Sequence, residues 1–291
     1  MQEIIKEIRK QAQLSQNEFA EALRVSFSTV NRWENGKVIP NQLAQMSIYE
    51  YAQSKGIAVD AMVYEKIRNA QAALALQPDR MLLYHGSKSG IKGTIAPVSR
   101  EHCDFGSGFY MGTIPEQPLT LISSFEQSRF YLLSVDMTGM STLQIPPDID
   151  WAMLVAFRRG RMESIKGSSF YRKYAEMTEN KDFLIGSIAD DRMFFVLDNF
   201  FQGNITDTAL ISSLSALKLG EQVVAVTQKA CDAIRIEKEI PLSFLEKKAL
   251  QDASEQNRVK GIALADEICK KHRREGLFFD EILEKASEES K

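Results

Sequence analysis

Two short stretches of the chain combine residue types that can bind a small ligand. The first is Leu82–Ser87, an apolar run that ends in His-Gly-Ser, and the second is Asp104–Thr113, in which glycines precede a tyrosine. The ring of His85 can hydrogen-bond a ligand hydroxyl through one nitrogen. Gly86 has no Cβ, so its backbone can approach a ligand closely. Tyr110 offers a flat face on which an aromatic ring can stack.

In this order and spacing, the two stretches resemble the NAD-binding signature of the ADP-ribosyltransferase superfamily of the diphtheria-toxin and poly(ADP-ribose) polymerase type. The resemblance implies an α+β domain with a split sheet and NAD as the substrate. It implies that His85 and Gly86 seat NAD and that Tyr110 stacks on the nicotinamide ring. Ser87 and Gly108 belong to the same implied site. Taken singly, His85 and Tyr110 would be better explained as an ordinary strand-end histidine and core tyrosine; with both motifs present, we favour the ligand site.

The third position of this signature is a glutamate at the start of a late strand. Its carboxylate hydrogen-bonds the nicotinamide ribose and stabilises the positive charge that develops as nicotinamide leaves. The late strand here is residues 220–227, and its apolar residues align Gln222 with that glutamate, with Glu221 one residue earlier. Side chains alternate faces along a strand, so only one of the two can enter the site. We take Gln222 as the catalytic candidate and Glu221 as the alternative; in the other interpretation both simply face solvent.

A closer resemblance covers nearly all of residues 80–240. An uncharacterised bacterial family of unknown function within the same superfamily has a similar His-Gly-Ser, Phe-Gly-x-Gly-Phe-Tyr, central Ile-Gly-x-Ile-Ala-Asp-Asp-Arg and late strand led by glutamine. The central motif is Leu184–Arg192 in this sequence. Asp190 and Asp191 precede an apolar run, which predicts a helix N-cap. The alternative is that Asp191 or Arg192 lines the target side of the site.

The N-terminal residues 1–56 predict a compact helical domain. Ser15 and Glu18 have the spacing of a capping box, and Asn35-Gly36 predicts the end of a later helix. The segments Leu-Ser-Gln-x-x-Phe-Ala and Val-x-x-x-Thr-Val-x-x-Trp-Glu-Asn-Gly resemble the helix-turn-helix of the phage Cro and repressor proteins. That resemblance implies DNA binding, with the second helix of the motif in the major groove. The implied DNA-binding residues are Gln16 at a phosphate and Phe27, Ser28, Thr29 and Arg32 at the bases.

The charge of this helical domain limits how strongly one copy can hold DNA. Arg32 can read a guanine through two hydrogen bonds, whereas Ser28 and Thr29 discriminate little between bases. Residues 1–56 carry seven basic and six acidic side chains, a net charge of +1, so attraction to phosphate is weak. We therefore expect a homodimer on DNA; the alternative is a protein-interaction module. Val30 and Trp33 are expected in the core.

The composition is ordinary for a globular chain. Its 291 residues leave room for two domains, and 44% are hydrophobic and 26% charged. The net charge of −3 does not favour a polybasic nucleic-acid or membrane binder as a whole. The three cysteines and three histidines lack metal-ligand spacing, so no metal is expected. No signal-peptide or transmembrane pattern is found, so we expect a cytoplasmic protein without a membrane partner.

Four regions are expected from these motifs, and the fold class is α+β. They are a repressor-like domain (1–56), a helical linker (57–78) that stops at Pro78, an NAD-binding domain (79–240) and a helical extension (241–291). Ser243 and Glu246 predict a capping box at the start of the extension. Strands are expected at 129–135 and 182–186, and helices at 151–161 and 206–217.

The function that these resemblances imply is mono-ADP-ribosylation of a protein or nucleic-acid target. Fusion to a helix-turn-helix domain suggests a bacterial toxin or phage-defence effector with an antitoxin partner. One alternative is a transcription regulator whose degenerate transferase fold only senses NAD or binds a partner. Another is an NAD glycohydrolase, which uses water as the acceptor.

Overall fold

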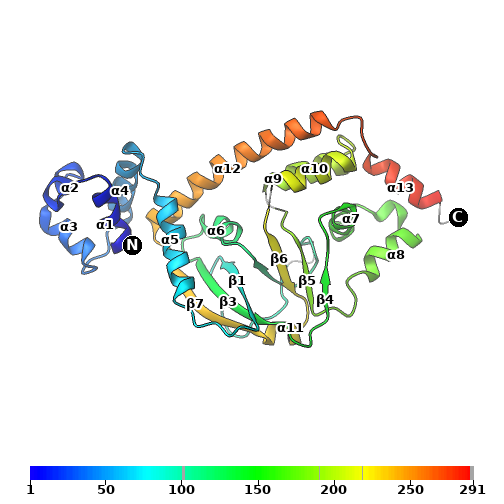
Figure 1. The fold of residues 1–291 in the computed structure, drawn as a ribbon, viewed down its shortest axis with the longest axis horizontal. Helices are drawn as coiled ribbons and strands as arrows, with labels where there is room; N and C mark the ends of the chain where they lie inside the picture. The colour runs from blue at the N-terminus through cyan, green and yellow to red at the C-terminus, as the bar shows by residue number, and fades with distance from the viewer. Residues whose placement is uncertain (100–101, 190, 218, 289–291) are drawn as a thin grey trace.

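A computed structural model describes residues 1–99, 102–189, 191–217 and 219–288 of the chain. The first four helices lie together at one end of the molecule, and the fifth lies beside the sheet (Figure 1). Ser15 and Glu18 form both hydrogen bonds of the predicted capping box, and Gly36 follows the third helix in the left-handed conformation at φ +66°. These helices are α1 (Gln2–Gln11), α2 (Gln16–Ala22), α3 (Phe27–Glu34), α4 (Gln42–Ser54) and α5 (Val59–Ala72).

Helix α5 occupies the expected linker, but it is packed rather than free. Ile67 is buried in a core that also contains Tyr84 of the sheet and Leu245 of the C-terminal extension. The helix ends at Ala72, earlier than the stop expected at Pro78. The helical domain and one half of the sheet therefore share a continuous apolar core.

Seven strands of the described residues form one sheet in the order β4-β5-β6-β2-β1-β3-β7. Neighbouring strands are antiparallel except β4 and β5, which are parallel. The ladder between β1 and β3 has eight pairs, whereas that between β1 and β2 consists of Tyr84 and Gly112 alone. The sheet is thus weakly joined between β1 and β2. The strands are β1 (Arg80–Ser87), β2 (Phe109–Gly112), β3 (Arg129–Asp136), β4 (Thr142–Gln144), β5 (Phe183–Ser187), β6 (Glu221–Ala225) and β7 (Ile234–Pro241).

Strand register divides the side chains of β1, β2, β5 and β6 between two faces. Tyr84 pairs with Gly112, Gly112 with Gln222, and Gln222 with Gly186, so even-numbered residues of these strands share a face. This helix-covered face packs on α7, α9 and α10 over β2, β5 and β6, and on α5, α6 and α12 over β1 and β3. The opposite, loop-covered face packs on α11 and on Ile91 of the loop after β1. The confirmed fold class is therefore a mixed α+β domain behind a helical one.

The C-terminal helix α12 is the longest element of the described chain. Ser243 and Glu246 form the capping box predicted at its start. The helix contacts α4 and α5 at one end and α9 and α10 further along, toward α13 (Figure 1). No helix in the described ranges is long and apolar enough to cross a membrane. The helices after α5 are α6 (Glu116–Ile122), α7 (Ile149–Arg158), α8 (Ser169–Glu176), α9 (Asp191–Phe201), α10 (Asp207–Leu217), α11 (Gln228–Asp232), α12 (Phe244–Lys271) and α13 (Phe279–Glu288), with a short 3₁₀ turn at Glu163–Ile165.

Candidate functional site

Helix α3 presents one face to solvent and buries the other. Val30 and Trp33 lie in the core, as predicted, while Phe27 is 49% exposed. Ser28 and Arg32 are also exposed. This arrangement leaves the expected base-side residues at the N-terminal half of α3 open to a partner, which is what a helix inserted in a DNA groove requires.

Thr29 differs from its neighbours on α3 because it takes part in the cap of the helix. It is half-buried. Its backbone N–H donates to Ser26 Oγ at 3.2 Å, and its hydroxyl lies 2.8 Å from the same oxygen. Thr29 therefore has a structural contact in addition to any contact with DNA.

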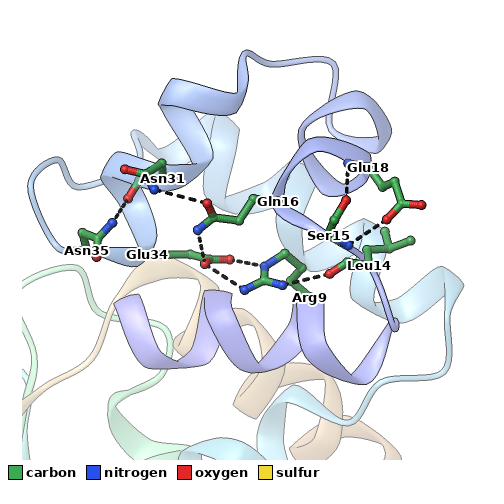
Figure 2. Close-up of polar contacts among 8 residues, drawn as sticks. All are labelled: Arg9, Leu14, Ser15, Gln16, Glu18, Asn31, Glu34 and Asn35. Atoms are coloured by element: carbon green, nitrogen blue, oxygen red, sulfur yellow. Dashed lines mark hydrogen bonds and ion pairs between the residues drawn. The ribbon is translucent and has the colours of Figure 1, made fainter.

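Gln16 belongs to a polar network that fixes α2 and α3 on α1 (Figure 2). Its Nε2 donates to Glu34 at 2.7 Å, and its Oε1 accepts from Asn31 Nδ2 at 3.2 Å. Arg9 Nε donates to the other oxygen of Glu34 at 2.6 Å. Burial alone would raise the pKa of Glu34, but the hydrogen bonds from Arg9 and Gln16 outweigh it and hold the pKa below its ordinary value. The side chain predicted to meet a phosphate therefore also positions the recognition helix.

His85 sits where β1 and β2 separate, and its protonation pattern follows from its contacts. Its Nδ1 lies 2.7 Å from the carbonyl oxygen of Tyr110. A carbonyl can only accept, so Nδ1 carries the hydrogen. Burial lowers the pKa of His85, although this hydrogen bond opposes the effect. The ring is therefore neutral at pH 7, and its Nε2 is an acceptor for a ligand hydroxyl.

The surroundings of the His85 ring are aromatic. Phe109 stacks on it with ring centroids 4.4 Å apart, and Tyr131 lies at 6.2 Å. The Tyr131 hydroxyl accepts from the backbone N–H of Ile91 at 2.9 Å, which draws the loop after β1 over this face. Phe109 belongs to the glycine-containing stretch, but the aromatic position of the family pattern matched Tyr110, so the sequence did not indicate a role for Phe109.

Tyr110 points to the helix-covered face, opposite His85. Its hydroxyl donates to Gly106 O at 2.7 Å and accepts from Phe105 N–H at 3.1 Å. Burial raises the pKa of Tyr110. In this structure the side chain thus closes the glycine-containing loop on itself, and it does not share a face with His85.

Gln222 also points to the helix-covered face and is 6% exposed. Its Nε2 donates to Ser187 O at 3.1 Å and reaches Asp104 Oδ2 at 3.4 Å. Asp104 is in turn paired with Arg159 at 2.6 Å. These contacts join β6 to the end of β5 and to the loop before β2, so the side chain of Gln222 has a structural role.

Glu221 lies on the loop-covered face, the face of His85, because its neighbour Gln222 lies on the other. It is exposed, and its carboxylate accepts from Gln144 Nε2 at 2.7 Å. Its backbone carbonyl accepts from Thr113 N–H at 2.9 Å. Of the two acid or amide candidates on β6, only Glu221 can therefore face the same ligand as His85.

The glycines of the two stretches have packing reasons as well. A Cβ on Gly86 would lie 2.4 Å from the backbone oxygen of Pro118 in α6, and one on Gly108 would lie 2.4 Å from a methyl of Val224. Ser87 ends β1 opposite Arg129 of β3. The structure therefore requires both glycines whether or not a ligand binds.

The central motif leads from β5 into α9. Asp190, the expected N-cap, lies outside the described residues, and α9 begins at Asp191. Arg192 lies against α12, where its Cδ is 2.3 Å from the position that a Cβ on Gly261 would take. This contact places Arg192 between two helices.

The salt bridge of Asp104 and Arg159 was missed by the sequence analysis. Asp104 opens the glycine-containing stretch, but its partner comes 55 residues later, at the end of α7. The Arg159 guanidinium also lies 4.2 Å from the centre of the Phe194 ring. No local sequence signal connects these positions.

Comparison with known protein families agrees with this division of the chain. Residues 5–43 match a helix-turn-helix family, so the chain carries a DNA-binding domain of this class. Residues 81–236 match the family described as Protein of unknown function (DUF3990). That match covers more than half of the chain, which therefore belongs to the DUF3990 family. No curated protein and no solved structure matches the chain.

Proposed function

We propose that this protein is a DNA-binding regulator whose DUF3990 domain is an NAD-dependent mono-ADP-ribosyltransferase. The observation that carries the enzymatic half is the pairing of His85 and Glu221 on the loop-covered face. His85 is neutral, and its Nε2 has no hydrogen-bond partner among the described residues; Glu221 carries an exposed carboxylate two strands away. An acceptor and a carboxylate are the two groups that a bound ribose needs.

In the proposed reaction, His85 Nε2 accepts a hydrogen bond from a hydroxyl of the nicotinamide ribose. The bond between C1′ and nicotinamide breaks and its electron pair leaves with nicotinamide. Glu221 stabilises the positive charge that develops on the ribose. A nucleophile of the acceptor then forms a bond to C1′ and loses its proton. Water in place of that nucleophile would give NAD hydrolysis.

The N-terminal domain supplies the regulatory half of the proposal. Exposed Ser28 and Arg32 on α3, above a buried Val30 and Trp33, are placed to contact bases. With a domain charge of only +1, operator binding requires a homodimer. We propose that the protein acts in the cytoplasm as a toxin or phage-defence effector that regulates its own operon, together with an antitoxin partner.

Two experiments test the two halves. Full-length protein incubated with lysate and tagged NAD should label a discrete protein or nucleic-acid target, and it should release nicotinamide. In a DNA-binding assay, Arg32→Ala should weaken binding to an operator-like palindrome about 10- to 100-fold and relax its sequence preference. Gln16→Ala should weaken binding to all sequences about equally, and Arg68→Ala, on the exposed side of α5, should have no effect. Absence of sequence-selective binding at low salt would make the domain an interaction module.

A second function is favoured by the contacts of Gln222. Because this amide is bound to Ser187 and Asp104 and Glu221 to Gln144, the domain can be read as a non-catalytic sensor that binds NAD or a partner. In that case NAD stabilises the protein against heat, but no nicotinamide is released with any lysate fraction.

A further inference from the structure

Arg158, the last residue of α7, has an unusual environment. One guanidinium nitrogen donates to the hydroxyl of Thr178. The group lies against Gly106, where a Cβ would be 3.4 Å from the guanidinium carbon. Its Nε is buried, and none of the described residues offers it an acceptor. Among the described residues, the guanidinium of Arg158 therefore lies beside the glycine-containing loop 102–108 with two neutral partners, the Thr178 hydroxyl and the Phe157 ring, whose centre is 5.4 Å away.

The neighbouring Arg159, in contrast, has a counter-ion. It pairs with Asp104 at 2.6 Å. Among the described residues, no carboxylate lies within ion-pair distance of Arg158, and burial lowers its pKa, opposed only by the nearby Tyr110. A partly buried charge without a counter-ion destabilises a fold. Its presence in a folded chain therefore calls for a ligand of opposite charge.

The groups around Arg158 suit an anion. Gly106 is buried with a φ of +83°, and because it has no side chain its backbone lies directly against the guanidinium. His102 is exposed, and its Nδ1 lies 3.2 Å from the carbonyl of Arg158. In the part of the chain that the structure describes, the carboxylate near this loop is that of Asp104, and Arg159 neutralises it. The loop itself is held in place by the Tyr110 hydroxyl. The local charge is thus positive and the geometry is fixed.

We propose that Arg158 and loop 102–108 form a binding site for a phosphate group. A guanidinium presents parallel N–H donors that match two oxygens of a phosphate. The site lies toward the helix-covered face, with Tyr110, whereas the proposed NAD contacts of His85 and Glu221 lie on the other face. It therefore goes beyond the proposed transferase function and does not depend on it. The ligand is inorganic phosphate or diphosphate, or the phosphate of a small nucleotide.

The test is binding of pyrophosphate and of ADP-ribose by calorimetry to full-length protein that carries His85→Asn, because ADP-ribose is part of NAD and would otherwise also bind the proposed NAD site. Arg158→Gln should weaken binding at least tenfold, whereas the matched control Arg161→Gln, an exposed arginine three residues on, should leave it unchanged. Stronger binding of ADP-ribose than of pyrophosphate would identify a nucleotide as the source of the phosphate, and the reverse would identify the free anion. Unchanged affinity on adding Arg158→Gln, or no binding of either probe to the parent His85→Asn protein, would overturn the proposal.

Thermal unfolding without ligand separates this role from a structural one. Arg158→Met removes a charge without a counter-ion and should leave the melting temperature unchanged or raise it. Arg159→Met breaks the pair with Asp104 and should lower it. If Arg158→Met lowers the melting temperature as much as Arg159→Met, Arg158 is a structural residue and the proposal fails. Loss of NAD binding in a His85 variant has no bearing on this result, because His85 is on the other face.

Discussion

His85 and Glu221 share the loop-covered face of the sheet, whereas Gln222, the next residue along β6, faces the opposite side. The register of β1, β2 and β6 fixes this relationship, and the burial of Gln222 against Asp104 agrees with it. Gln222, which aligns with a catalytic glutamate by its apolar neighbours, is thus not the residue that shares a face with His85. The contacts of Gln222 give this glutamine a structural role, and the reaction that we propose takes its acidic group from the preceding residue, Glu221.

Exchanging these two neighbours on β6 should separate catalysis from stability. Glu221→Gln keeps the shape and the contact with Gln144 but removes the charge, so nicotinamide release should fall about 100-fold or more with little change in NAD affinity. Gln222→Ala removes two hydrogen bonds, although Ser187 O keeps its donor Trp151 Nε1 and Asp104 keeps Arg159. The loss should lower the free energy of unfolding by about 1–3 kcal/mol. The turnover of this variant per folded molecule should stay near that of the wild type.

A matched control for Glu221→Gln is Glu126→Gln, since Glu126 is exposed on the loop between α6 and β3. It should leave turnover and stability unchanged. If Gln222→Ala is inactive but fully stable while Glu221→Gln is active, the reaction takes place on the helix-covered face. Wild-type protein that releases no nicotinamide at all would support the sensor function.

His85→Asn tests the ligand-facing nitrogen alone. The amide nitrogen of asparagine can replace Nδ1 as the donor to Tyr110 O, but nothing replaces Nε2. The variant should keep its melting temperature and lose the stabilisation by NAD that the wild type shows. His272→Asn, far along the chain at the end of α12, is the control. A variant that melts with the wild type and is still stabilised by NAD would remove His85 from the site.

The pH dependence of NAD binding should follow the protonation of the His85 ring. Burial holds the pKa of His85 below its ordinary value of 6.5, so more than half of the rings are neutral at pH 6.5. The stabilisation by NAD should therefore be present at pH 7 and above and decline with a midpoint below pH 6.5, as Nε2 takes a proton and can no longer accept. Thermal shifts measured across this range check the expectation, and a decline with its midpoint above pH 6.5 would contradict it.

The sequence predicted what local signals determine. The capping boxes at Ser15 and Ser243 and the turn at Gly36 involve residues a few positions apart, and the structure confirms all three. Alternation along β6 showed that Glu221 and Gln222 face opposite sides, but not which side is which. That depends on the pairing of Gly112 with Gln222, a contact between distant segments.

The polar contacts between elements could not be predicted from the sequence, because they too depend on segments that are far apart along the chain. The resemblance to repressor proteins implied that Gln16 meets a phosphate, but its amide also joins α2 to Glu34 of α3. The pair of Asp104 and Arg159 forms only when α7 packs on the loop before β2. Such contacts arise from packing, and residue types alone do not indicate them.

Gly86→Ala tests whether this glycine is needed for packing against α6 or for the close approach of a ligand. The added methyl would lie 2.4 Å from the backbone oxygen of Pro118, so α6 must move, and we expect a loss of about 1–3 kcal/mol in the free energy of unfolding. Ser87→Ala, at the next position, should be nearly neutral. Denaturant unfolding without NAD measures both. A Gly86→Ala protein as stable as the wild type but unable to bind NAD would show that the glycine serves the ligand.

Glu34→Gln tests whether the polar network in Figure 2 supports DNA recognition. The substitution leaves Arg9 in a largely buried position without its carboxylate, and losing one partner of such a pair costs about 3 kcal/mol. The pKa of Glu34 is held below its ordinary value of 4.5. The contribution of the ionised Glu34 to the free energy of unfolding is therefore complete above pH 4.5, and it is lost as the pH falls through the lowered pKa. Unfolding of the wild type should therefore become easier with acid below pH 4.5, and that part of the dependence should be absent in Glu34→Gln. At pH 7 the variant should also bind DNA more weakly than wild type, since α3 loses its anchor to α1. Equal stability of the two proteins at pH 7 would contradict this role for the pair.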